Sequence, residues 1–187
     1  HQHQFIGSLV MEAHVCCRGL LLPDPRYDAV MAIVLLGVRD SPQEDDGIKV
    51  VVAVGGCSAV GLPDDVTLMR VPTEQHLLEQ LVTIVRTWDP DILIGYEVQN
   101  MSWGYVLERC VALGGTGFVS QLSRIPAQNP GSRHSHHDPE LDQYGAQYSS
   151  HIHVAGRIVL NIWRLMKDEV SLQQYSLQSV AHHLLHT

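Results

Sequence analysis

Hydrophobic residues along this chain fall into short runs separated by polar, proline-rich or glycine-rich segments. Alternating or continuous apolar positions predict strands at 5–15, 29–38, 48–54, 66–71, 92–94 and 151–160. Apolar positions repeating every three or four residues predict helices at 74–85, 103–113, 118–124, 161–170 and 176–185. Thr73 and Ser176 are the expected N-caps of two of these helices. This order of strands and helices indicates an α/β domain.

The stretch from Trp88 to Tyr105 is the part around which the chain is organised. A helix runs into a turn at Asp89-Pro90, a buried-type strand follows at 92–94, and a new helix begins near Trp103. In open α/β sheets, sites form at the carboxyl ends of strands, where helices begin. Residues 96–102 are therefore expected to lie at a site.

Glu12 and His14 share one face of the first predicted strand, because side chains alternate along a strand. Both side chains are able to bind metals, which is unusual for a core strand. From the residues alone, the favoured interpretation is a solvated strand face or a hydrogen-bonded polar pair. The alternative is a strand that contributes to a site.

Length and composition fit a single domain over 1–187 that is a fragment of a longer protein, since the chain begins with His1 and no Met. The net charge of −8, with His neutral, opposes unspecific attraction to phosphate backbones. No apolar run reaches the roughly 20 residues of a membrane span. The four cysteines lack the spacing of a zinc site, which favours a reduced intracellular compartment. The His-rich segment 134–137 fits a loop better than a metal site.

The motif D-P-D-I-L-I-G-Y at Asp89–Tyr96 resembles the second exonuclease motif of the family-B DNA polymerases. That motif reads D-P-D, three hydrophobic residues, G-Y-N, and shortly afterwards F-D. In this sequence Glu97 stands at the Asn, Met101 at the Phe, and Ser102 at the metal-binding Asp. The family's frame is kept, and its metal-binding residue is replaced.

Two further segments carry the same resemblance. The first exonuclease motif of the family is a strand ending in D-x-E, and its two carboxylates correspond here to Glu12 and His14. The segment G-R-I-V-L-N at 156–161, followed by Y-S-L-Q-S-V at 175–180, is similar to a later pair of family segments, with Asn161 where many members have Asp. The third exonuclease motif, Y-x-x-x-D, is expected beyond Thr187.

The resemblance implies an RNase H-like exonuclease fold, a mixed sheet of about five strands flanked by helices. It also implies a degenerate site, because two-metal hydrolysis needs carboxylates and magnesium prefers oxygen ligands. No catalytic residue and no cofactor are expected for this domain, with Glu12, His14 and Glu97 as weak metal candidates and Ser102 as a lost ligand. The residues expected next to DNA are Tyr96, Asn100 and Met101.

The resemblance further implies a parent protein, a nuclear lesion-bypass DNA polymerase that uses Mg²⁺. Its expected partners are the DNA primer-template and polymerase accessory subunits, with no membrane. Two alternatives stay open. One is an active metal-dependent 3′-5′ exonuclease with Glu12, His14 and Glu97 as unusual ligands, and the other is a stand-alone module that binds nucleic acid or protein.

Overall fold

A mixed sheet forms the centre of the computed structural model, which describes residues 5–41, 47–56, 61–125 and 152–185. The sheet has six strands in the order β4-β3-β2-β1-β5-β6. They are β1 (Gly7–Val15), β2 (Val30–Arg39), β3 (Ile48–Val54), β4 (Thr67–Val71), β5 (Ile92–Gly95) and β6 (Ile158–Asn161). β1, β2 and β3 form an antiparallel meander, whereas β4 pairs parallel with β3, β5 with β1, and β6 with β5.

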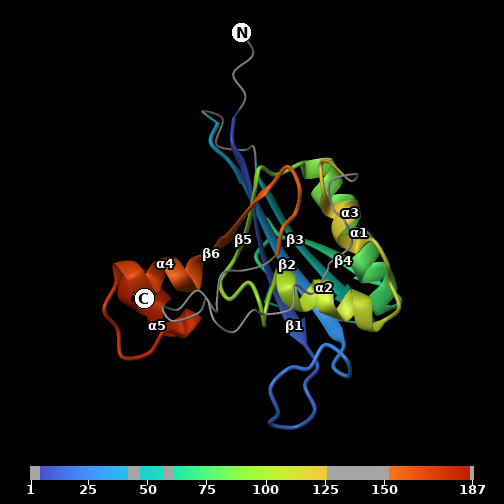
Figure 1. Cartoon of the computed structure of the whole chain (residues 1–187), viewed down its shortest axis with the longest axis horizontal. Coiled ribbons are helices and arrows are strands. Elements are labelled where there is room, and N and C mark those ends of the chain that lie inside the picture. Colours follow the sequence, from blue (N-terminus) through green and yellow to red (C-terminus); the bar gives the residue numbers. More distant parts are fainter. Residues whose placement is uncertain (1–4, 42–46, 57–60, 126–151, 186–187) are drawn as a thin grey trace, which may run out of the picture.

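Helices lie on both sides of this sheet (Figure 1). They are α1 (Glu74–Trp88), α2 (Trp103–Ala112), α3 (Phe118–Leu122), α4 (Ile162–Glu169) and α5 (Leu177–Leu185). The first three cover one face, where α1 packs on β2 and β3 and α2 packs on β1. α4 and α5 form a separate arm on the other side, reached through β6.

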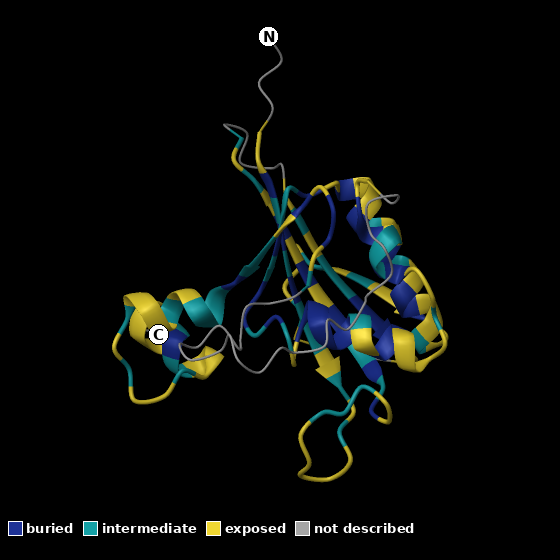
Figure 2. Cartoon of the chain, in the orientation of Figure 1, coloured by how far each residue is buried: buried dark blue, intermediate teal, exposed yellow. Residues whose placement is uncertain are grey.

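The hydrophobic core lies between the sheet and α1. Alternation along the strands directs Leu9, Met11 and Leu35 towards the helices, and all three are buried. Leu77 and Leu81, on the apolar face of α1, pack into the same cluster. Figure 2 shows this buried layer between the strands and the helix.

The boundaries of α1 follow from its end residues. Thr73 caps it, as predicted, by accepting a hydrogen bond from a backbone N–H of the first turn. The helix continues past the predicted end at Val85 as far as Trp88, because the Trp88 side chain is buried in the core. Asp89 then takes a left-handed φ of 49° and its N–H closes onto the Val85 carbonyl, which ends the helix.

The predicted α/β architecture is confirmed, although the sheet has six strands where about five were expected. The strand predicted at 151–160 is too long, since only 158–161 form a strand and Gly156, with a φ of 82°, makes a turn before it. His153, inside the predicted strand, therefore lies before the observed one. His151 and the segment 134–137 lie outside the described residues.

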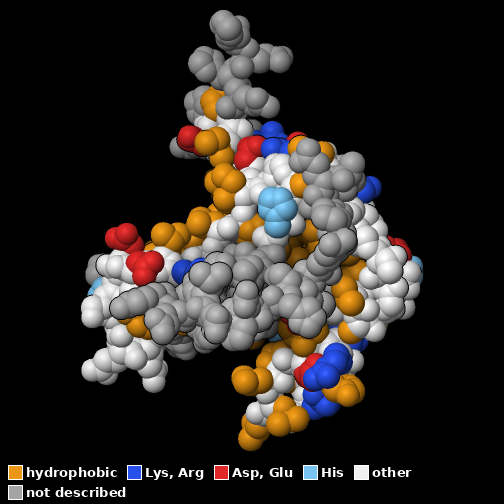
Figure 3. All heavy atoms as spheres, in the orientation of Figure 1, with side chains coloured by type: hydrophobic (Ala, Val, Ile, Leu, Met, Phe, Trp, Pro, Cys, Tyr) orange, Lys and Arg blue, Asp and Glu red, His pale blue; other side chains and the backbone are white. Residues whose placement is uncertain are grey.

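Part of the surface is apolar (Figure 3). Hydrophobic side chains gather on the loop between β1 and β2, at the lower end of the view, beside Arg and Asp side chains. Others line the flank of the sheet above α4. Across the described ranges, every helix is too short or too polar to cross a membrane.

Candidate functional site

The site predicted from the sequence lies where β1 and β5 end side by side. These strands run parallel, with Val10 opposite Ile94 as the last pair of the register. Beyond that pair, Oε1 of Glu12 accepts a hydrogen bond from the backbone N–H of Tyr96 at 2.7 Å. The first and second motifs of the sequence therefore meet at one place in the fold.

The carboxyl group of Glu12 is half-buried at this junction. Burial raises its pKa, the hydrogen bond from Tyr96 N–H opposes the rise, and the nearby carboxylate of Glu97 adds to it. Glu97 itself accepts a hydrogen bond from the backbone N–H of Asn100 at 3.1 Å, which closes the turn between β5 and α2. Glu12 and Glu97 are thus brought together, with like charges that repel.

Ser102 occupies the position of the family's metal-binding Asp, and its side chain bonds to the backbone. The residue is 0% exposed, and its hydroxyl donates to the backbone carbonyl of Met11 in β1 at 2.7 Å. Gly95 lies directly beneath, where any side chain would overlap the Ser102 hydroxyl. The hydroxyl is thus held between two strands as a structural link.

The start of α2 is fixed around Ser102 by further contacts. The indole N–H of Trp103 donates to the Ile94 carbonyl at 2.9 Å, and the N–H of Gly104 donates to the Val98 carbonyl at 2.7 Å. Gly104 lies against the backbone of residues 98 and 99 with no room for a side chain. The orientation of Ser102 is therefore set by the packing of the whole turn.

These side chains do not fit a pair of catalytic metal ions. Two-metal hydrolysis requires several carboxylates around ions about 4 Å apart. Ser102 is neutral, and its hydroxyl donates a hydrogen bond to a backbone carbonyl. His14 would offer a nitrogen ligand, whereas magnesium prefers oxygen. Within the described ranges no group of three His, Cys, Asp or Glu side chains is arranged to hold a metal. Glu12 and Glu97 are the carboxylates that the turn brings together.

The three residues predicted to lie next to DNA differ in exposure. Asn100 and Met101 are exposed at the tip of the turn. Tyr96 is buried, its carbonyl accepts from Trp163 N–H at 2.8 Å, and its hydroxyl donates to the Tyr175 carbonyl at 3.0 Å. Burial also raises the pKa of the Tyr96 hydroxyl. Tyr96 therefore ties the site to the α4–α5 arm, and proximity to DNA stays a prediction for all three.

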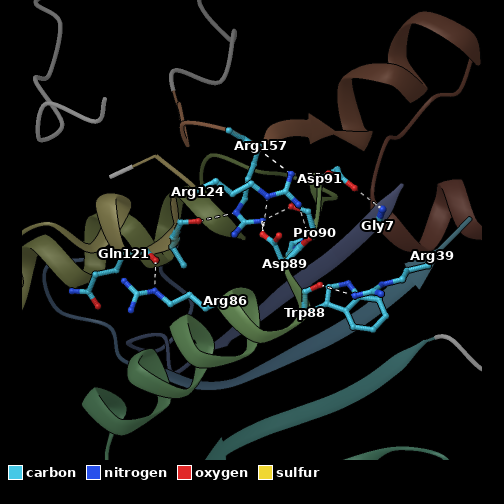
Figure 4. A network of polar contacts seen from close by, with 12 residues as sticks. Gly7, Arg39, Arg86, Trp88, Asp89, Pro90, Asp91, Gln121, Arg124 and Arg157 are labelled. Atoms are coloured by element: carbon cyan, nitrogen blue, oxygen red, sulfur yellow. Dashed lines mark hydrogen bonds and ion pairs between the residues drawn. The ribbon is translucent and has the colours of Figure 1, made fainter. Parts of the chain in front are cut away.

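A polar network at the opposite end of β5 was not predicted from the sequence (Figure 4). Asp89 accepts from Arg124 Nε at 2.7 Å and from Arg157 Nη1 at 2.9 Å. Asp91 accepts from Arg124 Nη1 at 2.7 Å and from the N–H of Gly7 at 2.8 Å. The D-P-D motif thus joins the starts of β1, β5 and β6, and its role here is structural.

Asn161 is a second feature whose role the sequence left open. It lies opposite Gly95 at the end of β6, and it is buried. Its side-chain oxygen is without a hydrogen-bond partner among the described residues. The residue marks the step from β6 into α4.

A family model described as DNA polymerase family B, exonuclease domain, matches residues 12–180. The chain belongs to this family, and its fold is that of the exonuclease domain. The particular relatives it resembles include the DNA polymerase zeta catalytic subunits of Mus musculus, 32% identical over 203 residues, and of Saccharomyces cerevisiae, 31% identical over 194 residues. The DNA polymerase delta catalytic subunit of Glycine max is 31% identical over 163 residues.

These matches cover 100%, 98% and 87% of this chain, in the order given, but only 6%, 12% and 14% of the relatives. The chain therefore spans a small part of the length of each. This is an exonuclease domain of the kind found in DNA polymerase zeta-like proteins.

Proposed function

We propose that this chain is a degenerate 3′-5′ exonuclease module of a zeta-type lesion-bypass DNA polymerase. It no longer cuts DNA, and it serves as a structural, DNA-proximal part of the polymerase. The observation that carries the proposal is the hydrogen bond from the buried Ser102 hydroxyl to the Met11 carbonyl. The group that replaces a metal-binding carboxylate is neutral and is already engaged with the backbone.

The state of Glu12 supports the same proposal. One of its oxygens is engaged with Tyr96 N–H, and burial raises its pKa, which disfavours the charged form that a cation needs. A polymerase that extends mismatched or damaged primer ends would gain from the loss of editing, because an active editor removes such ends. The acid-to-neutral exchange at Ser102 fits that task.

A direct assay tests the proposal. The full-length polypeptide that contains this chain is incubated with 3′-labelled single-stranded DNA, first with magnesium and then with manganese. The matched control is the Glu12→Gln, Glu97→Gln double variant, in which an amide oxygen still accepts at each position. We expect nucleotide release no faster from the native protein than from this variant. Metal-dependent release that the variant abolishes would overturn the proposal.

An active exonuclease with unusual ligands is the competing function. The observation in its favour is that Glu12 bonds to the N–H of Tyr96, the chain neighbour of Glu97, and the Glu97 carboxylate also raises the pKa of Glu12. With His14 on the same strand face as Glu12, these would be its ligands. The manganese arm of the assay addresses this function, since manganese accepts nitrogen ligands more readily than magnesium.

The setting of the domain is part of the proposal. We expect a nuclear protein whose polymerase domain uses Mg²⁺ and which binds a primer-template and accessory subunits. Reading the gene downstream of residue 187 checks this, because family-B polymerase motifs such as S-L-Y-P-S and Y-G-D-T-D should follow. A stop codon in their place would favour a stand-alone binding module.

A further inference from the structure

The loop that joins β1 to β2 carries three consecutive leucines at its tip. Leu20, Leu21 and Leu22 are 106%, 62% and 87% exposed, and Leu20 and Leu22 exceed every other large apolar residue in the described part of the chain. A single exposed leucine is ordinary, but three in succession on a projecting loop form an apolar patch that suggests a contact. Figure 3 shows apolar side chains gathered on this loop, at the lower end of the molecule.

Buried and half-buried polar contacts hold the base of this loop. The Asp28 carboxylate accepts from Arg18 Nε at 2.8 Å and from a backbone N–H of the loop at 2.9 Å. The carbonyls of Asp28 and Pro25 accept from the Tyr105 hydroxyl at 2.7 Å and from Arg109 Nη1 at 3.0 Å, both on α2. The leucines therefore project from a preorganised support, which lowers the entropy cost of docking.

The charges of the loop are paired within it. Arg18 pairs with Asp28, Arg26 pairs with Asp24, and both guanidinium groups stack on the Tyr27 ring, at 4.5 and 5.8 Å. Binding to a phosphate backbone depends on cations that neutralise phosphates, and these cations already have carboxylate partners. The loop thus fits an apolar protein surface better than it fits nucleic acid.

We infer that Leu20–Leu22 dock into an apolar pocket on another folded part of the same polypeptide, outside residues 1–187. The inference rests on the proposed function, because it treats the chain as a module of a much longer polymerase. The match to this chain covers only 6% of the mouse relative and 12% of the yeast relative. An apolar contact without free charge is typical of permanent interfaces, and a surface of the same polypeptide is always present at high effective concentration.

Photo-crosslinking in the full-length polypeptide tests this inference. A benzophenone amino acid replaces Leu21, and the matched control carries it at Val111, another exposed apolar residue, on α2. We expect position 21 to crosslink within its own polypeptide to a residue outside 1–187, with a yield independent of protein concentration. We also expect the crosslink to be lost when Leu20 and Leu22 are changed to Ser, and the Val111 probe to give no product at that pocket.

Four results would overturn the inference: a crosslink to a second copy, to a separate subunit, to DNA, or none at all in a variant whose circular dichroism is native. The result is independent of the nuclease assay. A protein that degrades DNA and still gives the intramolecular crosslink would overturn only the proposed loss of activity. An inert protein without the crosslink would overturn only the docking of the loop.

Discussion

At the scale of single residues, the side chains at two positions of the exonuclease motifs form hydrogen bonds with the backbone. The Ser102 hydroxyl donates to a carbonyl of β1, and the Glu12 carboxylate accepts from the N–H of Tyr96, just after β5. Each contact crosses between β1 and the chain around β5. These two hydrogen bonds therefore connect β1 to the segment around β5 and contribute to stability.

Restoring the acid at Ser102 should destabilise the protein. In Ser102→Asp the carboxylate would be buried against the Met11 carbonyl with no proton to donate, a cost of about 3 kcal/mol or more. Ser102→Ala loses only the hydrogen bond, about 1–2 kcal/mol. Urea unfolding measures both, and we expect the order native, Ala, Asp.

Urea unfolding of both variants in the presence of magnesium tests whether this position binds a cation. If the turn between β5 and α2 holds cations, magnesium should restore stability to Ser102→Asp and leave Ser102→Ala unchanged. We expect no difference between the two variants in their response. A Ser102→Asp protein as stable as the native one would show that the Ser102 hydrogen bond does not stabilise the fold.

Glu12 gives a prediction that depends on pH. Its folded-state pKa is raised, so between the ordinary value of 4.5 and the raised value the native state binds more protons than the unfolded chain. Its contribution to stability therefore falls as pH rises through that window. Glu12→Gln should remove this dependence. The free energy of unfolding of the variant minus that of the native protein should therefore increase from acid to neutral pH. A constant difference across that range would contradict the assignment.

At the scale of elements, the D-P-D network joins segments that are far apart in the sequence. Besides its bond to Asp89, Arg157 donates to the carbonyls of Leu122 and Pro90, and its side chain is only 2% exposed. It thus connects α3, the start of β5 and the approach to β6. Desolvation lowers the pKa of this guanidinium, while the Asp89 carboxylate opposes the shift.

Loss of Arg157 should therefore be costly. Arg157→Ala leaves two buried carbonyls without donors, and we expect a loss of about 2–4 kcal/mol in the free energy of unfolding. The matched control is Arg86→Ala, which removes an exposed hydrogen bond to the Gln121 carbonyl and should cost about 0.5 kcal/mol or less. Equal losses in thermal or urea unfolding would show that the network has no special role.

The α4–α5 arm depends on Tyr96 in a way that hydrogen exchange can measure. Tyr96→Phe removes the bond to the Tyr175 carbonyl and should cost about 1 kcal/mol. We expect faster amide exchange in α5 and in the segment before it, and unchanged exchange in α1. Uniform acceleration across both helices would mean that the arm is not an independent unit.

At the scale of the whole molecule, charge limits what the domain does alone. The net charge of −8 repels a phosphate backbone, so we expect weak, salt-sensitive binding of single-stranded DNA. Fluorescence anisotropy across a salt series measures this. Tight binding at physiological salt would show a local basic path that outweighs the overall charge.

Local patterns in the sequence predicted most of the fold. The strand at 48–54 was placed with its observed ends, and Thr73 was correctly predicted as a cap, because both depend on neighbouring residues. The hydrogen bond from Ser102 to Met11 and the network around Asp89 were not predicted, since each joins residues far apart in the sequence. Burial of Tyr96 was missed for the same reason, because its partner Tyr175 lies in a distant segment.

The close fit of Ser102 above Gly95 has an evolutionary consequence. Under the proposed function, an aspartate at this position would place an unpaired charge in the core, where the Ser102 hydroxyl bonds to β1. Such a variant would lose stability before it gained any activity, since Glu12 and His14 also differ from the D-x-E pair of the family. We therefore expect nuclease activity to require several simultaneous substitutions in this protein.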